Sequence, residues 1–267
     1  MPKHRINGLD MFYDIGDGGQ PLVLISGVSS DHTGWKLTQL PHFSAAGCRC
    51  LLFDNRDVGQ TGESPLASYG TEQFASDTAE LIRHLGLGPT HIVGASMGGM
   101  IAQQLALHHP DVVRSLTLVC TSARPDAYMK DVIESWKNAA ANLSREAFLQ
   151  DRMPWLFTHR FYEKTEIAEA YRKRVLSNPI PQPVASFQRQ CDSILGHDTT
   201  ALLPAIRVPT HVIVGAEDLL IPPRHSRRLA ELIPNARLTI VPETGHCLFW
   251  ESTVEFNRAV LDFLSGQ

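Results

Sequence analysis

One stretch, residues 91–100, constrains the fold of this chain more than any other part of the sequence. It consists of an apolar run typical of a strand, the turn Gly94-x-Ser96-x-Gly98, and the start of a helix expected to end near residue 109. A serine at such a sharp turn is strained, and glycine is needed on both sides because a Cβ would crowd the turn. The free N–H groups at the start of the helix favour negative charge beside the serine. The pentapeptide alone is a weak signal, but with this strand and helix it predicts a nucleophile elbow with Ser96 as the nucleophile.

Strand-like and helix-like runs alternate through most of the chain. Apolar strands are expected at residues 22–25, 50–53, 112–119, 210–214 and 237–241, and helices at residues 33–46, 71–85, 97–109, 223–233 and 254–264. Such alternation is typical of an α/β fold, in which helices cover both faces of a doubly wound, mostly parallel sheet. Two extended runs between residues 6 and 15 predict an antiparallel edge that leads into this sheet.

The alternation stops between residues 122 and 198, where no strand-like run occurs. Apolar residues such as Val132 and Trp136 fall here at helical spacing. We therefore expect an α/β core made of residues 1–121 and 199–267, with a helical cap inserted at residues 122–198. Because this segment is rich in aromatic residues, a minority of them should line a cavity beneath it. The residues predicted to contact a substrate are Gly27, Trp136, Trp155 and Phe157.

Composition and charge argue against several classes of protein. The chain has 267 residues, is 43% hydrophobic and carries a formal net charge of −4 with no basic stripe, so neither nucleic acid nor a membrane is expected as a partner. The first ten residues lack the apolar core of a signal peptide, and no later segment is long and apolar enough to span a bilayer, which predicts a cytoplasmic protein. Five cysteines without C-x-x-C spacing, and the lack of an H-E-x-x-H motif, argue against disulfides and a metal site. No cofactor is expected.

Two polar residues follow the last two predicted strands, at the sheet edge where Ser96 should also lie. A serine hydroxyl is a weak nucleophile near neutral pH and needs a base within hydrogen-bond reach, and that base needs a third group to fix its tautomer. His246 and Asp218 have the chemistry for these roles, and the three residues occur in the chain order Ser, Asp, His. We interpret Ser96, Asp218 and His246 as a catalytic triad. Glu217, next to Asp218, is the alternative acid.

The motifs around these three residues resemble those of a known family. Gly94-Ala95-Ser96-Met97-Gly98-Gly99, Gly215-x-x-Asp218-x-x-x-Pro222 and Gly245-His246 resemble the nucleophile, acid and base segments of the α/β-hydrolase superfamily, and the resemblance extends from residue 6 to residue 264. Within the superfamily the chain is most similar to bacterial carboxylesterases and to enol-lactonases of the 3-oxoadipate type. The resemblance implies a mostly parallel eight-stranded sheet with a helical cap. It also implies an oxyanion hole formed by the backbone N–H groups of Met97 and Val28.

The sequence departs from the family pattern in two loops. His-Gly often follows the first buried strand in the family, whereas Ser26-Gly27 stands there in this chain, next to the implied oxyanion donor Val28. The run Asp-x-Arg-Gly-x-Gly-x-Ser, common in the family, has Asp57 in place of Gly and Thr61 in place of Ser. We therefore expect the loop that contains Asp57 to differ in shape from the family pattern.

The leading hypothesis for function is a hydrolase that cleaves carboxylic esters or lactones through an acyl-enzyme intermediate. A C–C bond hydrolase or a cofactor-free perhydrolase could use the same triad. An alternative of another class is a small-molecule receptor that keeps the hydrolase fold. The expected partner is a small ester or lactone, and the sequence leaves the oligomeric state open.

The charge of the substrate can be argued from the predicted cap. A mainly apolar pocket favours neutral esters with short to medium acyl chains. An enol-lactone substrate instead carries a carboxylate, which must be paired with a cation when it is buried. The cap arginines nearest to apolar positions in the sequence are Arg124, Arg152 and Arg160. A solvated position on a helix face is the simpler interpretation of each one.

Overall fold

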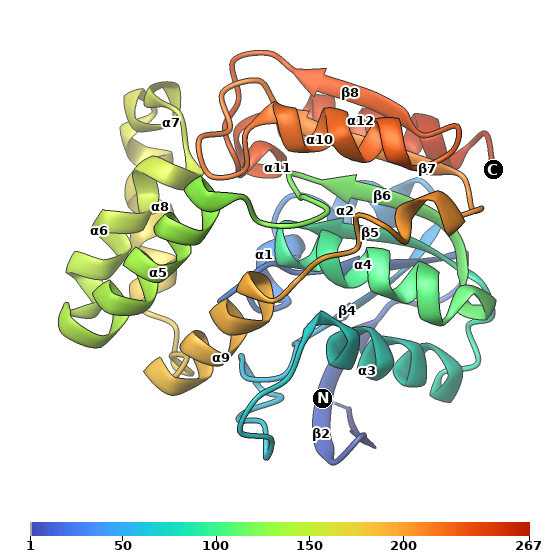
Figure 1. Ribbon diagram of the computed structural model, residues 1–267, viewed down its shortest axis with the longest axis horizontal. Helices are drawn as coiled ribbons and strands as arrows, with labels where there is room; N and C mark the ends of the chain where they lie inside the picture. The colour runs from blue at the N-terminus through green and yellow to red at the C-terminus, as the bar shows by residue number, and fades with distance from the viewer. Residues whose placement is uncertain (1) are drawn as a thin grey trace.

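The computed structural model describes residues 2–267, and its centre is one sheet of eight strands (Figure 1). The strands are β1 (Lys3–Ile6), β2 (Leu9–Ile15), β3 (Gln20–Ile25), β4 (Cys48–Phe53), β5 (Thr90–Ala95), β6 (Val113–Val119), β7 (Thr210–Gly215) and β8 (Arg237–Val241). They lie in the order β1-β2-β4-β3-β5-β6-β7-β8. Strand β2 is antiparallel to both of its neighbours, and the other pairs are parallel. The mostly parallel eight-stranded sheet with an antiparallel edge is therefore confirmed.

Helices cover both faces of this sheet. They are α1 (Thr33–Lys36), α2 (Leu40–Ala45), α3 (Thr71–His84), α4 (Met97–His108), α5 (Ala127–Asn142), α6 (Arg145–Leu156), α7 (His159–Glu163), α8 (Thr165–Leu176), α9 (Val184–Leu195), α10 (Pro223–Leu232), α11 (Leu248–Glu251) and α12 (Thr253–Leu264), with 3-10 turns at Pro110–Val112 and Leu203–Ala205. None of the helices in residues 2–267 is long and apolar enough to cross a membrane.

The central strands are apolar on both sides because both sides are covered. In β3, Val23 belongs to the core on one face of the sheet and Leu24 to the core on the other, and both are fully buried. Neighbouring residues of a strand point to opposite faces, so a continuous apolar run is what a doubly covered strand requires. Helix α4 contributes Met100 to the first core, and α2 and α12 contribute Phe43 and Phe256 to the second.

The prediction of one helix over residues 33–46 is wrong, because the structure has two short helices there, α1 and α2. Pro41 lies in the first turn of α2. Proline lacks an N–H and clashes with the turn before it, so it favours the first turn of a helix over its interior. The helix therefore breaks between Lys36 and Leu40.

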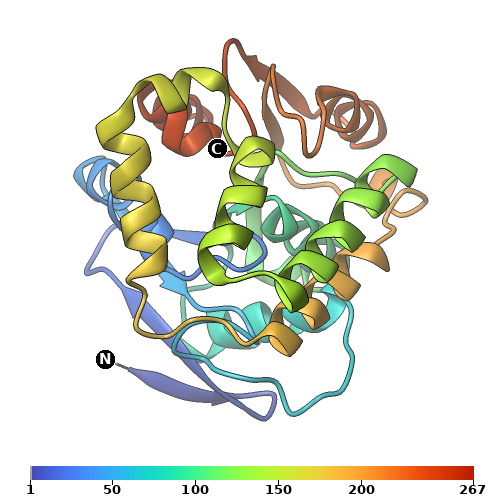
Figure 2. The ribbon, with the colours of Figure 1, turned by 90° about the vertical axis from the view of Figure 1, so that its left-hand side faces the viewer.

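Helices α5 to α9, which we call the helical segment, lie between β6 and β7 in the chain, where the sequence lacks strands. Figure 1 shows α5 to α8 beside the sheet, at the end from which β6 leads into α5. Figure 2 views the molecule from that side and shows these helices in front of the sheet. Trp136 of α5 is fully buried where α5 packs against α6 and α9.

The loop after β4 depends on the side chain of Asp57. The φ angle of this residue is 68°, in the left-handed region that favours glycine. Its buried carboxylate accepts hydrogen bonds from Ser64 N–H (2.7 Å), the Ser186 hydroxyl (3.0 Å), Arg189 (2.6 and 2.8 Å) and the Tyr69 hydroxyl. Burial by itself would raise the pKa of Asp57, but the bonds from Arg189 and Tyr69 outweigh it and hold the pKa below its usual value. These contacts offset the backbone strain and tie the loop to α9.

We predict that the protein loses stability as the pH falls from about 6.5 to about 4. Burial lowers the pKa of His91, His197 and His211, each to about 4. A histidine in the unfolded chain takes up its proton near pH 6.5, so between these two values the unfolded state binds more protons than the folded state. The free energy of unfolding should therefore decrease with falling pH in this window, and these groups should have no effect on it above the window.

Urea-induced unfolding at about pH 7.5 and about pH 5 would measure this difference. The variant His197→Gln carries no imidazole at a buried position and should lose less free energy of unfolding between the two pH values than the wild type does. A wild-type free energy of unfolding that is equal or higher at the lower pH would contradict the prediction.

Candidate active site

Ser96 lies where β5 ends and α4 begins, in a strained backbone conformation. Its φ is 56° and its ψ is −120°, outside the regions that L-residues ordinarily adopt. Backbone contacts hold the turn, because Ser96 N–H donates to the Val119 carbonyl (2.8 Å) and the Thr121 hydroxyl donates to the Ser96 carbonyl (2.8 Å). The geometry is that of the predicted strand-turn-helix elbow.

Three glycines let other backbone segments approach this turn. A Cβ at Gly94 would overlap the carbonyl of Gly98, and a Cβ at Gly98 would overlap the carbonyl of Ile25. Gly27, in the loop after β3, lies against the serine, since a Cβ there would be 3.1 Å from Ser96 Cβ. The start of α4 and the loop after β3 therefore lie close to Ser96.

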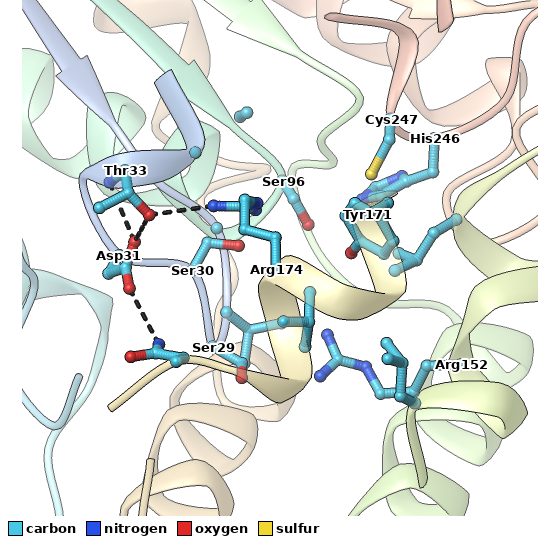
Figure 3. Close-up of a pocket in the computed structure, with 18 of the residues that line it drawn as sticks. Ser29, Ser30, Asp31, Thr33, Ser96, Arg152, Tyr171, Arg174, His246 and Cys247 are labelled. Atoms are coloured by element: carbon cyan, nitrogen blue, oxygen red, sulfur yellow. Dashed lines mark hydrogen bonds between the residues drawn. The ribbon is translucent and has the colours of Figure 1, made fainter. Parts of the chain in front are cut away.

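His246 and Asp218 come together from the loops after β8 and β7. The distance from His246 Nδ1 to Asp218 Oδ2 is 2.9 Å, and only 5% and 0% of the two side chains are exposed. Asp218 Oδ1 accepts a hydrogen bond from Ile221 N–H (2.8 Å). Because the carboxylate accepts the proton on Nδ1, Nε2 of the neutral imidazole is left as an acceptor. Figure 3 shows His246 and Ser96 on the same cavity.

The loop that carries His246 is tied to the helical segment through Glu251. One carboxylate oxygen of Glu251 accepts from Gly245 N–H (2.6 Å), and the other accepts from the N–H and the hydroxyl of Thr158 (2.8 and 2.7 Å). Cys247 N–H also donates to the carbonyl of Leu156 (2.9 Å). The position of His246 therefore depends on the helical segment as well as on the sheet.

Glu217, the alternative acid, has a different environment from its neighbour Asp218. Its side chain is 42% exposed and forms an ion pair with Arg160 at 3.0 Å. In residues 2–267 it makes no hydrogen bond to His246, whose Nδ1 is already bonded to Asp218. The geometry brings together Asp218 and His246, not Glu217 and His246.

The implied oxyanion donors, Val28 and Met97, lie in the loop after β3 and at the first position of α4. Within residues 2–267, neither backbone N–H donates a hydrogen bond. The next residue, Ser29, donates its N–H to Gln190 Oε1 of α9 at 2.9 Å. The loop is thus fixed beside Ser96, and the N–H groups of Val28 in this loop and of Met97 in α4 have no acceptor within residues 2–267.

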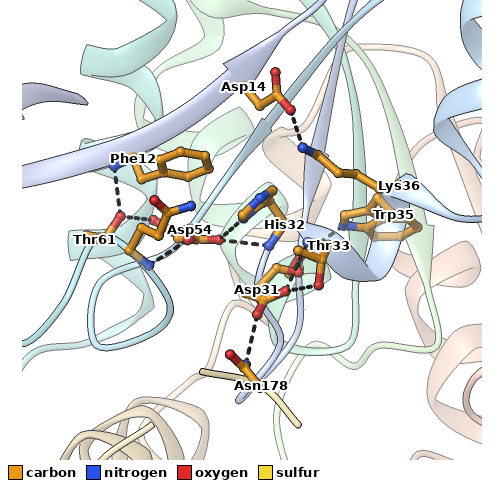
Figure 4. Close-up of polar contacts among 12 residues, drawn as sticks. Phe12, Asp14, Asp31, His32, Thr33, Trp35, Lys36, Asp54, Thr61 and Asn178 are labelled. Atoms are coloured by element: carbon orange, nitrogen blue, oxygen red, sulfur yellow. Dashed lines mark hydrogen bonds and ion pairs between the residues drawn. The ribbon is translucent and has the colours of Figure 1, made fainter. Parts of the chain in front are cut away.

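A polar network fixes the same loop from the side of the sheet (Figure 4). Asp54 accepts from the backbone N–H of His32 at 2.8 Å and lies 2.7 Å from His32 Nδ1. Asp31 accepts from Thr33 N–H (2.9 Å) and from the amide of Asn178 (3.2 Å). The loop is therefore rigidly held from two directions, which suits a site that must keep donors in place.

A cavity of about 500 Å³ lies between these loops and the helical segment, a volume within the range of small-molecule sites. Ser96 and His246 both line it, and no hydrogen bond in the described chain joins their side chains. Catalytic hydrogen bonds are often long until a substrate binds. The lining from the helical segment includes Trp136, Leu149, Arg152, Leu156, Tyr171, Arg174 and Val175.

Two of the four predicted substrate contacts line this cavity. Gly27 and Trp136 do so, whereas Trp155 and Phe157 do not. Trp155 and Phe157 therefore lie outside the wall of this cavity. Both are aromatic residues of the predicted cap, and residue type alone does not say which face of a helix meets the cavity.

The packing of α6 explains why these two residues lie elsewhere. Leu156 lines the cavity, so its neighbour Trp155 lies about 100° around the helix and packs against Tyr128, with 6.2 Å between the ring centroids. Phe157 follows the helix and stacks on Phe161, with 3.8 Å between the ring centroids. Both aromatic residues serve packing within the helical segment and its neighbours.

The three arginines that the sequence left undistinguished have different positions. Arg152 lines the cavity, Arg160 pairs with Glu217 and Glu243 (3.0 Å each) outside it, and Arg124 is exposed. Among these three candidates, only Arg152 can meet a ligand in the cavity.

The sequence interpretation missed Arg174 and Tyr171, which line the cavity from α8. They are three residues apart and so lie on one face of the helix. Spacing alone could have paired them, but only the docking of α8 shows that this face meets Ser96. Arg174 donates to Thr33 Oγ1 at 3.0 Å.

Cys120 lies beside the histidine and aspartate at the end of β6. Possible ligand atoms of Cys120, Asp218 and His246 lie within 4.8 Å of one another, and all three residues are buried. A cysteine binds metal as the thiolate, and burial raises the pKa of the Cys120 thiol well above its usual value. His246 Nδ1 is already engaged with Asp218. This trio therefore suits a hydrogen-bonded pair beside a neutral thiol better than it suits a metal centre.

Comparison with known proteins assigns the family. The family model described as alpha/beta hydrolase fold matches residues 20–253. The chain is 30% identical to "Putative non-heme bromoperoxidase BpoC" of Mycobacterium tuberculosis, over 97% of this chain and 98% of that protein. It is 29% identical to "Putative carbamate hydrolase RutD" of Caulobacter sp. (strain K31), over 93% and 91% of the two chains.

A solved structure is also similar to this chain over nearly its full length. The enol-lactonase from Burkholderia xenovorans LB400 matches with a TM-score of 0.89 at 26% identity, covering 99% of this chain and 100% of that one. The family match, the relatives and the eight-stranded sheet agree with one another. The chain belongs to the α/β hydrolase fold family.

Proposed function

We propose that the protein is a serine hydrolase that cleaves carboxylic esters or lactones through an acyl-enzyme intermediate. The Ser96 hydroxyl attacks the carbonyl carbon while His246 Nε2 accepts the hydroxyl proton. The tetrahedral intermediate then expels the alcohol, which takes that proton from His246. Water attacks the acyl-enzyme by the same route and releases the acid. Asp218 fixes the tautomer of His246 and stabilises its protonated form.

One observation carries this proposal: the buried hydrogen bond between His246 Nδ1 and Asp218 Oδ2, at 2.9 Å, beside the cavity that Ser96 lines. A carboxylate that holds Nδ1–H leaves Nε2 free to accept a proton from a serine. The strained turn at Ser96 is the conformation that exposes a nucleophile at the edge of a sheet. The chain order Ser, Asp, His agrees with this assignment.

We assign the oxyanion hole to the backbone N–H groups of Val28 and Met97. Both are free of protein acceptors within residues 2–267, and both belong to segments that approach Ser96 closely. The N-terminus of α4 adds the favourable end of a helix dipole. Donors that are fixed before the reaction stabilise the negative charge of the tetrahedral intermediate without a cost of reorganisation.

We further propose that residues 122–198 act as a cap on a core made of residues 1–121 and 199–267. The cap supplies Trp136 and Tyr171 to the cavity, and its contacts with the loop of His246 make it part of the site. A cap in this position would exclude water and select substrates by shape and charge.

The relatives support hydrolysis without specifying which bond is cleaved. One is named as a carbamate hydrolase, another as an enol-lactonase. The same triad could serve a C–C bond hydrolase or a perhydrolase, and the fold could bind a ligand without turnover. We favour esters and lactones because the triad and the assigned oxyanion donors together provide the groups that acyl transfer requires.

Labelling with a fluorophosphonate tests this proposal, because only an activated serine reacts rapidly with such a probe. We expect one label, located on Ser96 by mass spectrometry, and many turnovers on a panel of linear esters, aryl esters and lactones. A label on Ser96 without turnover of any ester or lactone would favour the C–C bond or perhydrolase alternative. Product release limited to one equivalent would favour a receptor. Failure to label Ser96 would overturn the serine mechanism.

A further inference from the structure

Three buried N–H groups around the cavity have no acceptor. Arg152 Nε, Arg174 Nε and Trp136 Nε1 make no hydrogen bond within residues 2–267, and all three residues line the cavity that contains Ser96. Burying a donor without an acceptor costs about 1–3 kcal/mol, and more when the donor is charged. Residues of this wall therefore carry donors that the protein leaves without an acceptor.

Arg152 is held in place by aromatic rings. Its guanidinium carbon lies 4.7 Å from the ring centroid of Trp136, 5.2 Å from that of Phe148 and 5.4 Å from that of Phe187. Ring faces attract a cation, but they do not accept hydrogen bonds from the N–H groups in the guanidinium plane. The rings therefore orient Arg152 and leave its N–H groups available to another partner.

No carboxylate of the described chain forms an ion pair with Arg152. Burial lowers the pKa of its guanidinium, which nevertheless stays protonated at neutral pH. Figure 3 shows the guanidinium reaching into the cavity from α6. A partly buried cation with an open side toward a cavity is most stable when a ligand brings the opposite charge.

The other charged groups of the cavity wall are already paired. Lys36 forms an ion pair with Asp14 at 2.5 Å. The carboxylate of Asp31 accepts hydrogen bonds from Thr33 (2.9 Å) and Asn178 (3.2 Å). Within residues 2–267 no ion pair joins Asp31 to Arg152, so this carboxylate does not serve as the partner of the cation on α6.

Arg174 differs from Arg152 in having a partner. It donates to Thr33 Oγ1 at 3.0 Å and lies 4.8 Å from the ring centroid of Trp250. Figure 3 shows it near Thr33, away from Arg152. It adds positive charge to the cavity, whereas Arg152 is the arginine whose guanidinium makes no hydrogen bond within residues 2–267.

We propose that the substrate of this site carries a carboxylate in addition to its ester or lactone group, and that Arg152 binds this carboxylate. The proposal rests on the proposed hydrolase function and narrows it to anionic substrates. A planar guanidinium can bind a carboxylate through two parallel hydrogen bonds, which also fixes the orientation of the ligand. The carboxylate takes no part in bond cleavage. It positions the ester carbonyl near Ser96.

The sequence favours neutral esters as substrates, because the predicted cap is rich in apolar residues. The position of Arg152 favours anionic substrates instead. The apolar residues are present, but an unpaired cation lies among them. A neutral acyl chain would leave Arg152 buried without a partner, whereas a carboxylate would satisfy it.

A pair of substrates that differ in charge and by one methyl group tests the proposal: 4-nitrophenyl hydrogen glutarate and its methyl ester. We expect the wild type to have a higher kcat/KM for the acid than for the methyl ester. Arg152→Met should lower the ratio of the two kcat/KM values by about tenfold or more, mainly through KM of the acid. Methionine keeps an apolar side chain of similar length against the aromatic rings.

Arg160→Met is the matched control, because it removes a cap arginine that is paired outside the cavity. It should change the ratio by no more than about twofold. Arg152→Lys keeps the charge without the planar fork and should lower the ratio less than Arg152→Met does, which allows the test even if the methionine variant folds poorly. A wild-type preference for the methyl ester, or equal losses on both substrates in Arg152→Met, would overturn the proposal.

A binding measurement tests the carboxylate site independently of the proposed hydrolase function. Isothermal titration of the Ser96→Ala variant with monomethyl glutarate and with dimethyl glutarate requires no turnover. The monoacid should bind more tightly, and adding Arg152→Met should weaken its binding by about tenfold. Equal affinity for the two probes would overturn the carboxylate site even if esters are hydrolysed. If the difference in affinity persists while Ser96→Ala keeps its activity, the carboxylate site stands and only the proposed serine mechanism fails.

Discussion

Replacing Ser96 with alanine should lower kcat for ester hydrolysis by about four to six orders of magnitude while the protein stays folded. The substitution removes the nucleophile and with it the covalent route. Within residues 2–267 the Ser96 hydroxyl makes no hydrogen bond, so its loss breaks no internal contact. The turn is held by backbone groups and by Gly94 and Gly98, and alanine leaves these unchanged. Steady-state kinetics with an aryl ester, together with the melting temperature, would measure both effects.

Ser122→Ala is a suitable control for this substitution. Ser122 is a buried serine whose hydroxyl likewise has no partner in the described chain, and it does not line the cavity. Its replacement should leave kcat within about twofold of the wild type. If Ser96→Ala retained more than about a tenth of the wild-type kcat, Ser96 would not be the nucleophile.

The elements that the sequence predicted well are those with local signals. The glycines around Ser96 define a turn by steric necessity, and the apolar runs of β3, β5, β6 and β7 identify strands buried on both faces. His246 and Asp218 could be paired because loops after parallel strands open at one edge of a sheet. Their hydrogen bond agrees with that argument, and their catalytic roles remain a prediction.

The cavity wall was less predictable because it depends on how helices dock. Trp155 and Leu156 are adjacent and both apolar, yet only Leu156 lines the cavity. Arg152 and Arg160 have the same chemistry, and their difference arises from the glutamates that pair with Arg160 from distant loops. The spacing of residues along one helix does not show which distant loops will contact it. The same limit explains why Arg174 was missed.

Replacing Asp218 with asparagine should lower kcat by about three to four orders of magnitude. The carboxylate of Asp218 accepts on both oxygens, from His246 Nδ1 and from Ile221 N–H. An amide has one acceptor oxygen, and the bond to Ile221 N–H favours turning its NH2 group toward His246. The imidazole would then accept at Nδ1 and carry its proton on Nε2, where it could not take the proton of Ser96.

Glu217→Gln tests the alternative acid with the same chemical change one residue away. Glu217 is partly exposed and pairs with Arg160, so its replacement should remove a surface ion pair and change kcat by no more than about threefold. Kinetics of both variants, with melting temperatures to detect a loss of fold, would compare the two acids directly. A larger loss in Glu217→Gln than in Asp218→Asn would make Glu217 the partner of His246. The buried 2.9 Å contact between His246 and Asp218 predicts the opposite order, because a fixed tautomer requires an acceptor that is held in place before the substrate binds.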